Sequence, residues 1–242
     1  MRRLIFTLLL LVLLVGGGFW FYRGIMSREI HLNNFFVGNY DKGVDVSSYQ
    51  ENVDFEKLEE QGIKFAFIKA TEGSGHVDKS FAEKWTAAAE TDIKTGAYHY
   101  FSYESSGAAQ AENFIKTVGD LSGHLPPVID LELTPEEVEN PPEKSVVVRG
   151  VKAFVAIIEE EYGVKPIIYS RQDYFKKYLA DDFTDYPRWI TNVFFPVFIE
   201  AGDGWLFWQY NDRGELEGYS GEKYIDLNVL NKGQSLESLL VK

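Results

Sequence analysis

From Gly43 onward, the apolar positions of the chain alternate between two patterns. Short apolar runs predict strands, and stretches in which apolar residues recur every three or four positions predict amphipathic helices. The eight expected strands are GVDV, IKFAFIKA, TGAYHYF, PPVIDLEL, PIIYS, PRWIT, GWLFWQY and YIDLNV. The five expected helices cover residues 54–62, 78–91, 107–118, 147–162 and 172–180.

This alternation of strands and helices defines an expected fold class. Repeated βα units predict a parallel sheet, and eight strands favour closure into a barrel. Helical patterns fade after residue 180, so the last three strands carry no expected helix between them. We therefore expect an α/β fold, a modified TIM-like barrel of eight strands and five helices. It would span residues 43–233 and be followed by a C-terminal tail at 234–242.

The N-terminal residues have a different character. An almost wholly apolar run covers Leu4–Tyr22, and 19 helical residues extend about 28 Å, enough to cross a bilayer core. Aromatic residues 19–22 occupy the place of a small-residue cleavage site and resemble an interfacial belt. We predict that residues 1–23 form a signal anchor, a transmembrane helix with residues 4–22 in the membrane, and that 24–42 form a tether.

The location of the protein follows from that segment. An uncleaved anchor would hold the large domain outside the cytoplasm, in the periplasm or at the cell surface. The glycines at 16–18 leave a cleaved signal peptide open, in which case the domain would be secreted.

Charge and composition exclude several classes of function. The chain has 37 acidic and 24 basic residues, a formal net charge of −13, and every acidic residue follows Arg28. Such a domain repels phosphate backbones, so nucleic acid is not an expected partner. The absence of cysteine excludes disulfides, thiolate zinc sites and cysteine nucleophiles. The four histidines show no metal-ligand spacing, so we expect no histidine metal site; a hard cation held by carboxylates stays open.

A pair of carboxylates, Asp130 and Glu132, interrupts the apolar strand PPVIDLEL. Side chains two residues apart on a strand point to the same side, and their Cα atoms lie about 6.6 Å apart. The pair falls at the C-terminal end of the strand, where the active site of a βα barrel lies. This spacing suits the acid and the nucleophile or stabiliser of glycoside cleavage. Helix capping or salt bridging is the structural alternative.

Other strand ends carry comparable residues. Asp45 closes the first strand and Asp226 lies in the last, so three strands would bring carboxylates to one rim. Aromatic side chains near strand ends are possible sugar contacts, because sugars present apolar C–H faces; in the core they would be ordinary packing residues. These aromatic residues are Tyr98, Tyr100, Tyr169, Trp189, Trp208 and Tyr210.

Six segments, in order, resemble the motifs of glycoside hydrolase family 25, the lysozymes of the Chalaropsis type. They are GVDVSSYQENVDFEKLEEQGIKFAFIKATEG, DKSFAEKWTAAAETDIKTGAYHYF, PPVIDLE, PIIYS, WQY and YIDLN. The resemblance covers residues 43–231. It implies a modified barrel of eight strands and five helices. It also implies hydrolysis of the β-1,4 bond between N-acetylmuramic acid and N-acetylglucosamine in peptidoglycan, without metal or cofactor.

The same resemblance assigns roles to the four carboxylates. Glu132 matches the general acid, and Asp130 matches its partner, either a nucleophile or the group that orients the acetamido oxygen of the substrate. Asp45 and Asp226 match carboxylates that position substrate and hold the charge state of the acid. Both possible roles of Asp130 imply net retention of configuration. We interpret Glu72, at another strand end, as structural.

The chain also departs from the family pattern. Trp189 is kept in the sixth strand, but Thr191 and Val193 replace an alanine and a tyrosine that the family often has there. An early Asp-Trp pair of many members is here Asp54-Phe55. The sixth-strand change puts the shape of one sugar subsite in doubt. Two alternatives to an enzyme remain on the same barrel: a non-catalytic peptidoglycan-binding module and a cell-envelope interaction module.

Overall fold

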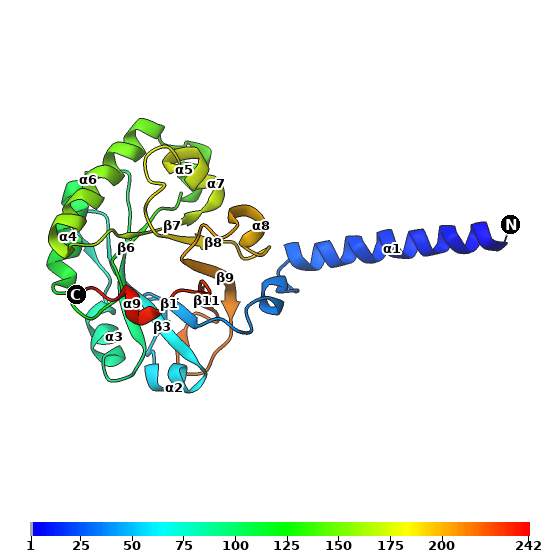
Figure 1. Ribbon diagram of the computed structural model, residues 1–242, viewed down its shortest axis with the longest axis horizontal. Helices are drawn as coiled ribbons and strands as arrows, with labels where there is room; N and C mark the ends of the chain where they lie inside the picture. The colour runs from blue at the N-terminus through cyan, green and yellow to red at the C-terminus, as the bar shows by residue number, and fades with distance from the viewer. Residues whose placement is uncertain (1) are drawn as a thin grey trace.

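The computed structural model describes the backbone of residues 2–242 and the side chains of residues 14–242. Eight strands close into a barrel, and the expected α/β barrel is confirmed (Figure 1). Around the barrel they follow the order β1 (Lys42–Val46), β3 (Ile63–Glu72), β5 (Lys94–Tyr100), β6 (Val128–Asp130), β7 (Ile167–Arg171), β8 (Arg188–Thr191), β9 (Phe207–Gly214) and β11 (Ile225–Leu230), which returns to β1. A short strand β4 (His76–Val77) extends β3, and β2 (Gln50–Glu51) pairs with β10 (Ser220–Gly221).

The direction of the last strand corrects the expectation of a parallel sheet. Strands β1 to β9 pair in parallel around the barrel, but β11 runs antiparallel to both β9 and β1. A parallel crossover needs a dozen or more residues and usually a helix. Only residues 215–224 connect β9 to β11, so the chain turns back directly. The start of β11 therefore lies at the same rim as the ends of the parallel strands.

The five expected helices are all present. They are α2 (Phe55–Glu60), α3 (Phe81–Ala88), α4 (Gly107–Val118), α6 (Lys144–Tyr162) and α7 (Gln172–Tyr174), which continues as the π-helix η2 (Phe175–Leu179). Local chemistry fixes their ends: the Asp54 side chain accepts the N–H of Lys57 to cap α2, and Gly163 ends α6 with φ of 67°. Four short helices were not expected: η1 (Leu32–Phe35), α5 (Pro135–Glu139), α8 (Phe198–Ala201) and α9 (Leu236–Leu239).

Strand β3 shows how the core divides into an inner and an outer layer. Phe65 and Phe67 pack inside the barrel, whereas Ala66 and Ile68 face the surrounding helices. Gly96 makes room for the inner layer, since a Cβ there would lie 2.5 Å from the Phe67 ring. Both faces of the strand are apolar because helices cover the outside and neighbouring strands enclose the inside.

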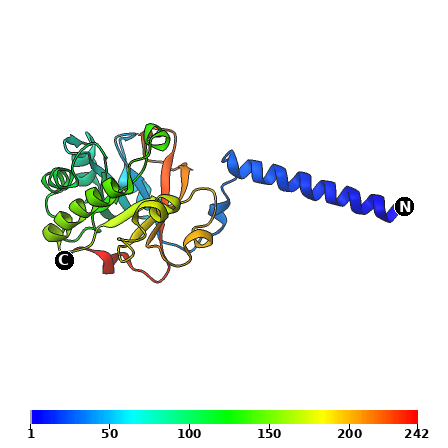
Figure 2. The same cartoon turned by 90° about the horizontal axis from the view of Figure 1, so that it is seen from above.

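Helix α1 (Arg2–Met26) projects away from the barrel (Figure 1, Figure 2). Among the residues that the structure describes, no helix combines the length and apolar character that a bilayer crossing requires. The prediction of a transmembrane segment at 4–22 is therefore not supported by the described part of the chain. Residues 4–13 of that segment lie outside the described side chains.

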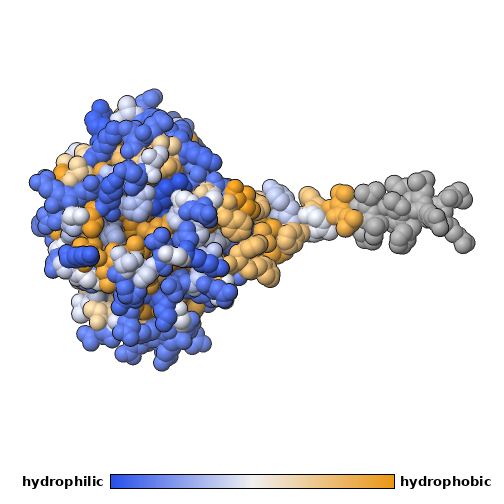
Figure 3. Space-filling model, viewed as in Figure 1, coloured by the Kyte–Doolittle hydropathy of each residue, from blue (hydrophilic) through white to orange (hydrophobic). Residues whose placement is uncertain are grey.

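The segment predicted as a tether, 24–42, packs against the barrel. The Asn33 side-chain amide donates to the carbonyl oxygens of Asn192 at 2.9 Å and Tyr210 at 3.0 Å. Val37 is buried in the cluster that covers the outside of β8 and β9. Apolar surface gathers where α1 meets the barrel (Figure 3). This part of the barrel wall is thus covered by the N-terminal segment and not by a βα helix.

Candidate active site

The four predicted carboxylates meet in one cavity of about 200 Å³ at the rim of the barrel. Asp45 comes from β1, Asp130 from the end of β6, Glu132 from the chain that follows β6, and Asp226 from β11. Asp45 and Asp226 are direct partners in the antiparallel pair of β1 and β11. The reversal of β11 is what brings Asp226, near the start of its strand, to this rim.

Four of the six predicted aromatic residues also line this cavity: Tyr98, Tyr100, Tyr169 and Trp189. Trp208 and Tyr210 do not. They lie on the outer face of β9, packed with Trp205 and Val197, and the Trp208 indole N–H donates to the Asn192 carbonyl at 3.0 Å. Side chains alternate along a strand, so Gln209 faces inward and its two neighbours face outward.

Asp45 is held by two side-chain amides. Asn228 donates to Asp45 Oδ2 at 2.7 Å, and Gln209 donates to the same oxygen at 3.1 Å. The Trp189 indole N–H donates to Asn228 Oδ1 at 2.9 Å, and the Tyr169 hydroxyl donates to Gln209 Oε1 at 2.8 Å. Each amide is therefore oriented with its NH₂ toward Asp45. Burial outweighs these bonds and raises the pKa of Asp45 to about 6.

Gln209 and Asn228 are site residues that the sequence interpretation missed. Both lie within motifs that were noticed, WQY and YIDLN. A signal was present for Asn228, because it stands two positions after Asp226 and so shares its face of the strand. For Gln209, the signal was its polar side chain between two aromatic residues, which indicates that it points to the opposite face of the strand.

The remaining carboxylates have raised pKa values for a shared reason. Burial raises the pKa of Asp130 and of Asp226 well above the usual range, and neighbouring carboxylates raise them further. Burial and the charge of Asp45 also raise the pKa of Glu132. Asp130 Oδ1 is buried and has no hydrogen-bond partner. Carboxylates this close cannot all ionise together, so the cavity can keep one protonated near neutral pH.

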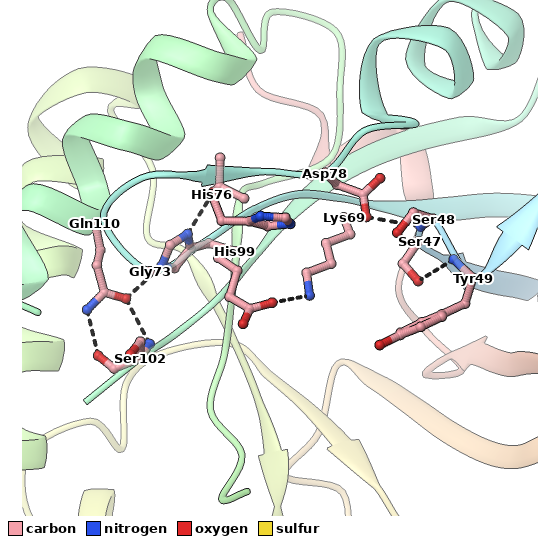
Figure 4. A network of polar contacts seen from close by, with 12 residues as sticks. Ser47, Ser48, Tyr49, Lys69, Gly73, His76, Asp78, His99, Ser102 and Gln110 are labelled. Atoms are coloured by element: carbon pink, nitrogen blue, oxygen red, sulfur yellow. Dashed lines mark hydrogen bonds and ion pairs between the residues drawn. The ribbon is translucent and has the colours of Figure 1, made fainter. Parts of the chain in front are cut away.

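One side of the cavity is lined by Ser47 and Tyr49, in the loop after β1, and by Lys69, within β3 (Figure 4). Tyr49, with 67% of its surface exposed, and Lys69 both line it. Lys69 Nζ pairs with Glu72 at 2.7 Å and lies 4.8 Å from the centre of the Tyr100 ring. Glu72 thus anchors a lysine at the cavity wall. Among the residues with described side chains, no group of three or more potential ligands is arranged to hold a metal ion.

A second, larger cavity of about 770 Å³ adjoins the first. The two share Glu132, Tyr169, Gln209 and Asp226 as lining residues. Thr191 and Val193, the two departures from the expected sixth-strand motif, line the larger cavity. The change in sequence is therefore located beside the carboxylates and does not alter them.

A closed α/β barrel with clustered carboxylates at the strand ends has the acidic groups that glycoside hydrolysis requires. Residues 44–219 match the model of the family described as glycosyl hydrolases family 25. This chain belongs to glycoside hydrolase family 25, and it is a glycoside hydrolase.

Three similar proteins illustrate the match. A solved family 25 glycosyl hydrolase from Bacillus anthracis is 43% identical and has a TM-score of 0.77, with 83% of this chain and 93% of that chain covered. The solved bacterial lysozyme from Streptomyces coelicolor is 28% identical with a TM-score of 0.75, covering 84% and 98%. The uncharacterized protein YegX of Escherichia coli K12 is 35% identical over 222 residues, 88% of this chain and 76% of that protein.

Proposed function

We propose that this glycoside hydrolase is a peptidoglycan muramidase, a lysozyme. It would hydrolyse the β-1,4 bond between N-acetylmuramic acid and N-acetylglucosamine. The observation that carries the proposal is the meeting of Asp45, Asp130, Glu132 and Asp226 in one cavity of a family 25 barrel. The similarity to a lysozyme from Streptomyces coelicolor supports the choice of substrate.

In this proposal Glu132 is the general acid. Its pKa is raised by burial and by the charge of Asp45, so it stays protonated to a higher pH than an ordinary glutamic acid. It can then give its proton to the oxygen that leaves with the departing sugar. Catalysis by Glu132 is lost as the pH rises through its raised pKa, because the ionised form has no proton to donate.

Asp130 would act on the other side of the reaction. It serves either as the nucleophile or as the group that orients the acetamido oxygen of the substrate, and both routes give net retention. Its buried Oδ1, which has no partner within the protein, is available for such a contact. Asp45 and Asp226 would position the substrate and maintain the protonation of Glu132. Proton NMR of the first-formed product tests retention, and an initial α-anomer would exclude it.

The test of the activity is digestion of purified peptidoglycan, with the new reducing ends identified by mass spectrometry. We expect N-acetylmuramic acid at those ends. Glu132→Gln should lower kcat by at least about 10²–10⁴-fold, since the amide keeps the size of the acid but cannot supply a proton. Glu139→Gln, the same change at an exposed position of α5, is the matched control. Equal activity of the two variants would refute the assignment of Glu132.

We also propose that the barrel acts outside the cytoplasm, where peptidoglycan lies, with residues 1–23 as a membrane anchor or an export signal. The apolar sequence of residues 4–22 supports this proposal. Cell fractionation with mass spectrometry of the N-terminus distinguishes the two forms. Recovery of the protein with Met1 intact in the cytoplasmic fraction would contradict both.

A further inference from the structure

The larger cavity lies beside the carboxylates, where it can contact substituents of a bound glycan. It shares Glu132, Tyr169, Gln209 and Asp226 with the carboxylate cavity, so the two form one continuous depression. Its volume, about 770 Å³, is well above the roughly 200 Å³ around the carboxylates. A cavity of this size accommodates a ligand well beyond a single small group. Its chemistry therefore bears on which substituents of the substrate are accepted.

The N-terminal segment supplies one wall of this larger cavity. Met26 and Arg28 line it, although both precede the residues that match the family model. The Arg28 guanidinium forms an ion pair with Asp212, at the end of β9, and lies 5.0 Å from the centre of the Phe194 ring. This wall therefore lies outside the residues that match the family model.

Charges in the larger cavity are partly fixed and partly free. Arg28 is paired with Asp212, and Arg171 makes two contacts of 3.0 Å with the Asp173 carboxylate. Lys176 lines the same cavity, is exposed, and makes no ion pair with any residue that the structure describes. Asp212 Oδ1 is buried without a hydrogen-bond partner. The cavity thus offers the free ammonium group of Lys176 together with the exposed carboxylate of Glu200, which makes no ion pair with any described residue.

This combination fits a ligand that carries both carboxylates and N–H donors. The cavity is lined by charges of both signs: three cations, Arg28, Arg171 and Lys176, and five carboxylates, Glu132, Asp173, Glu200, Asp212 and Asp226. A neutral sugar needs neither sign of charge. In peptidoglycan, the part with free carboxylates and amide N–H groups is the short peptide attached to the lactyl group of muramic acid. An ammonium group and a carboxylate oxygen bind such groups through charge-assisted hydrogen bonds.

We propose that the larger cavity binds the peptide stem of the glycan strand, with Lys176 contacting a stem carboxylate. The inference rests on the proposed muramidase function and adds a substrate preference to it. The enzyme then cleaves peptide-bearing strands in preference to strands from which an amidase has removed the peptides. The direction of this preference distinguishes the proposal from a cavity that only accommodates solvent.

The first experiment compares kcat/KM of the full-length wild type on peptide-bearing and amidase-stripped glycan strands of the same preparation. We expect the peptide-bearing strands to be favoured by about tenfold or more. Equal values, or a preference for stripped strands, would refute the stem site while leaving the muramidase intact. Failure to release reducing ends from either substrate would refute the proposed function, and the stem site with it.

The second experiment uses two neighbouring lysines of η2. Lys176→Glu reverses a charge inside the larger cavity, and Lys177→Glu makes the same change on a residue whose ammonium lies 4.7 Å from the Tyr178 ring, outside that cavity. We expect Lys176→Glu to lower the ratio of kcat/KM for peptide-bearing over stripped strands about tenfold, or about 1.4 kcal/mol. Lys177→Glu should leave that ratio unchanged. Equal ratios for the two variants, with melting temperatures confirming that both fold, would overturn the proposal.

Discussion

Strand β5 separates two buried polar networks of similar make-up. On its outer face, His99 lies between Thr71 Oγ1 at 2.7 Å and Gln110 Oε1 at 2.9 Å, and its ring stacks on Phe154. On the inner face, Tyr98 and Tyr100 point into the cavity where Asp45 is held by Gln209 and Asn228. In each network a titratable group is buried and fixed by side-chain amides.

The two networks differ in what remains unsatisfied. Both ring nitrogens of His99 have partners, and Gln110 uses its remaining capacity on the backbone of Ser102 and Ser105. Beside Asp45, by contrast, Asp130 keeps a buried oxygen with no partner. A network that is complete within the protein contributes to stability, whereas one that leaves an acceptor open at a cavity is available for substrate.

Gln110 in the outer network and Gln209 in the inner network are both side-chain amides, so the same substitution can be made at each. The larger loss of stability is expected at Gln110. Gln110→Met should lower the free energy of unfolding by about 2–5 kcal/mol, because it leaves several buried partners unsatisfied. The kcat of the folded fraction should stay unchanged, since Gln110 does not reach the cavity. Denaturant unfolding and a parallel activity assay measure the two. A large loss of kcat with an unchanged free energy of unfolding would show that Gln110 serves activity and not stability.

The outer network also predicts a pH dependence of stability. Burial lowers the pKa of His99 from 6.5 to about 4, so folding favours the neutral ring. The unfolded chain binds this proton below pH 6.5 and the folded chain does not until about pH 4. The stability that His99 contributes is therefore complete above pH 6.5 and is lost as the pH falls to 4, by about 3 kcal/mol.

A comparison with His99→Phe isolates this contribution. The buried carboxylates of the inner network have raised pKa values and act in the opposite sense, because their protonation at low pH favours the folded state. The difference in unfolding free energy between wild type and His99→Phe should therefore change with pH between 6.5 and 4. A difference that is constant across this window would show that His99 is charged when folded.

The smallest effect on stability, and a specific effect on activity, is expected at Gln209. Gln209→Met removes one donor from Asp45 and frees the Tyr169 hydroxyl, which lies 3.5 Å from Glu132 Oε1. A bond from Tyr169 to ionised Glu132 lowers the pKa of the acid. We expect a loss of stability of about 1 kcal/mol, and the alkaline limb of kcat/KM should move to lower pH. An unchanged pH profile would show that Gln209 does not influence the pKa of Glu132.

Much of the barrel could be predicted from sequence because local patterns determine it. The spacing of apolar residues located eight strands and five helices, since each βα unit buries its own faces. The reversal of β11 could not be seen in this way. Its residues show the same apolar pattern in either direction, and only the short connection at 215–224 decides that the chain turns back.

The candidate site was predictable to the extent that it depends on spacing along single strands. Asp130 and Glu132 share a side because they are two residues apart, and the structure places them in the same cavity. The aromatic run around Gln209 carried no information on which face points inward, so Trp208 and Tyr210 were placed in the site although they pack outside the barrel. The wall formed by Arg28 depends on long-range packing that no local pattern encodes.

The antiparallel direction of β11 also determines where a bead or a second protein can be attached without covering the active site. After β11 the chain returns to the end of the barrel opposite the carboxylates, where Val241 exchanges backbone hydrogen bonds with Gly123 and His124 before β6. Leu236 is buried there among the inner core residues. A bead or fluorescent protein coupled behind Lys242 would therefore leave the catalytic depression facing solution.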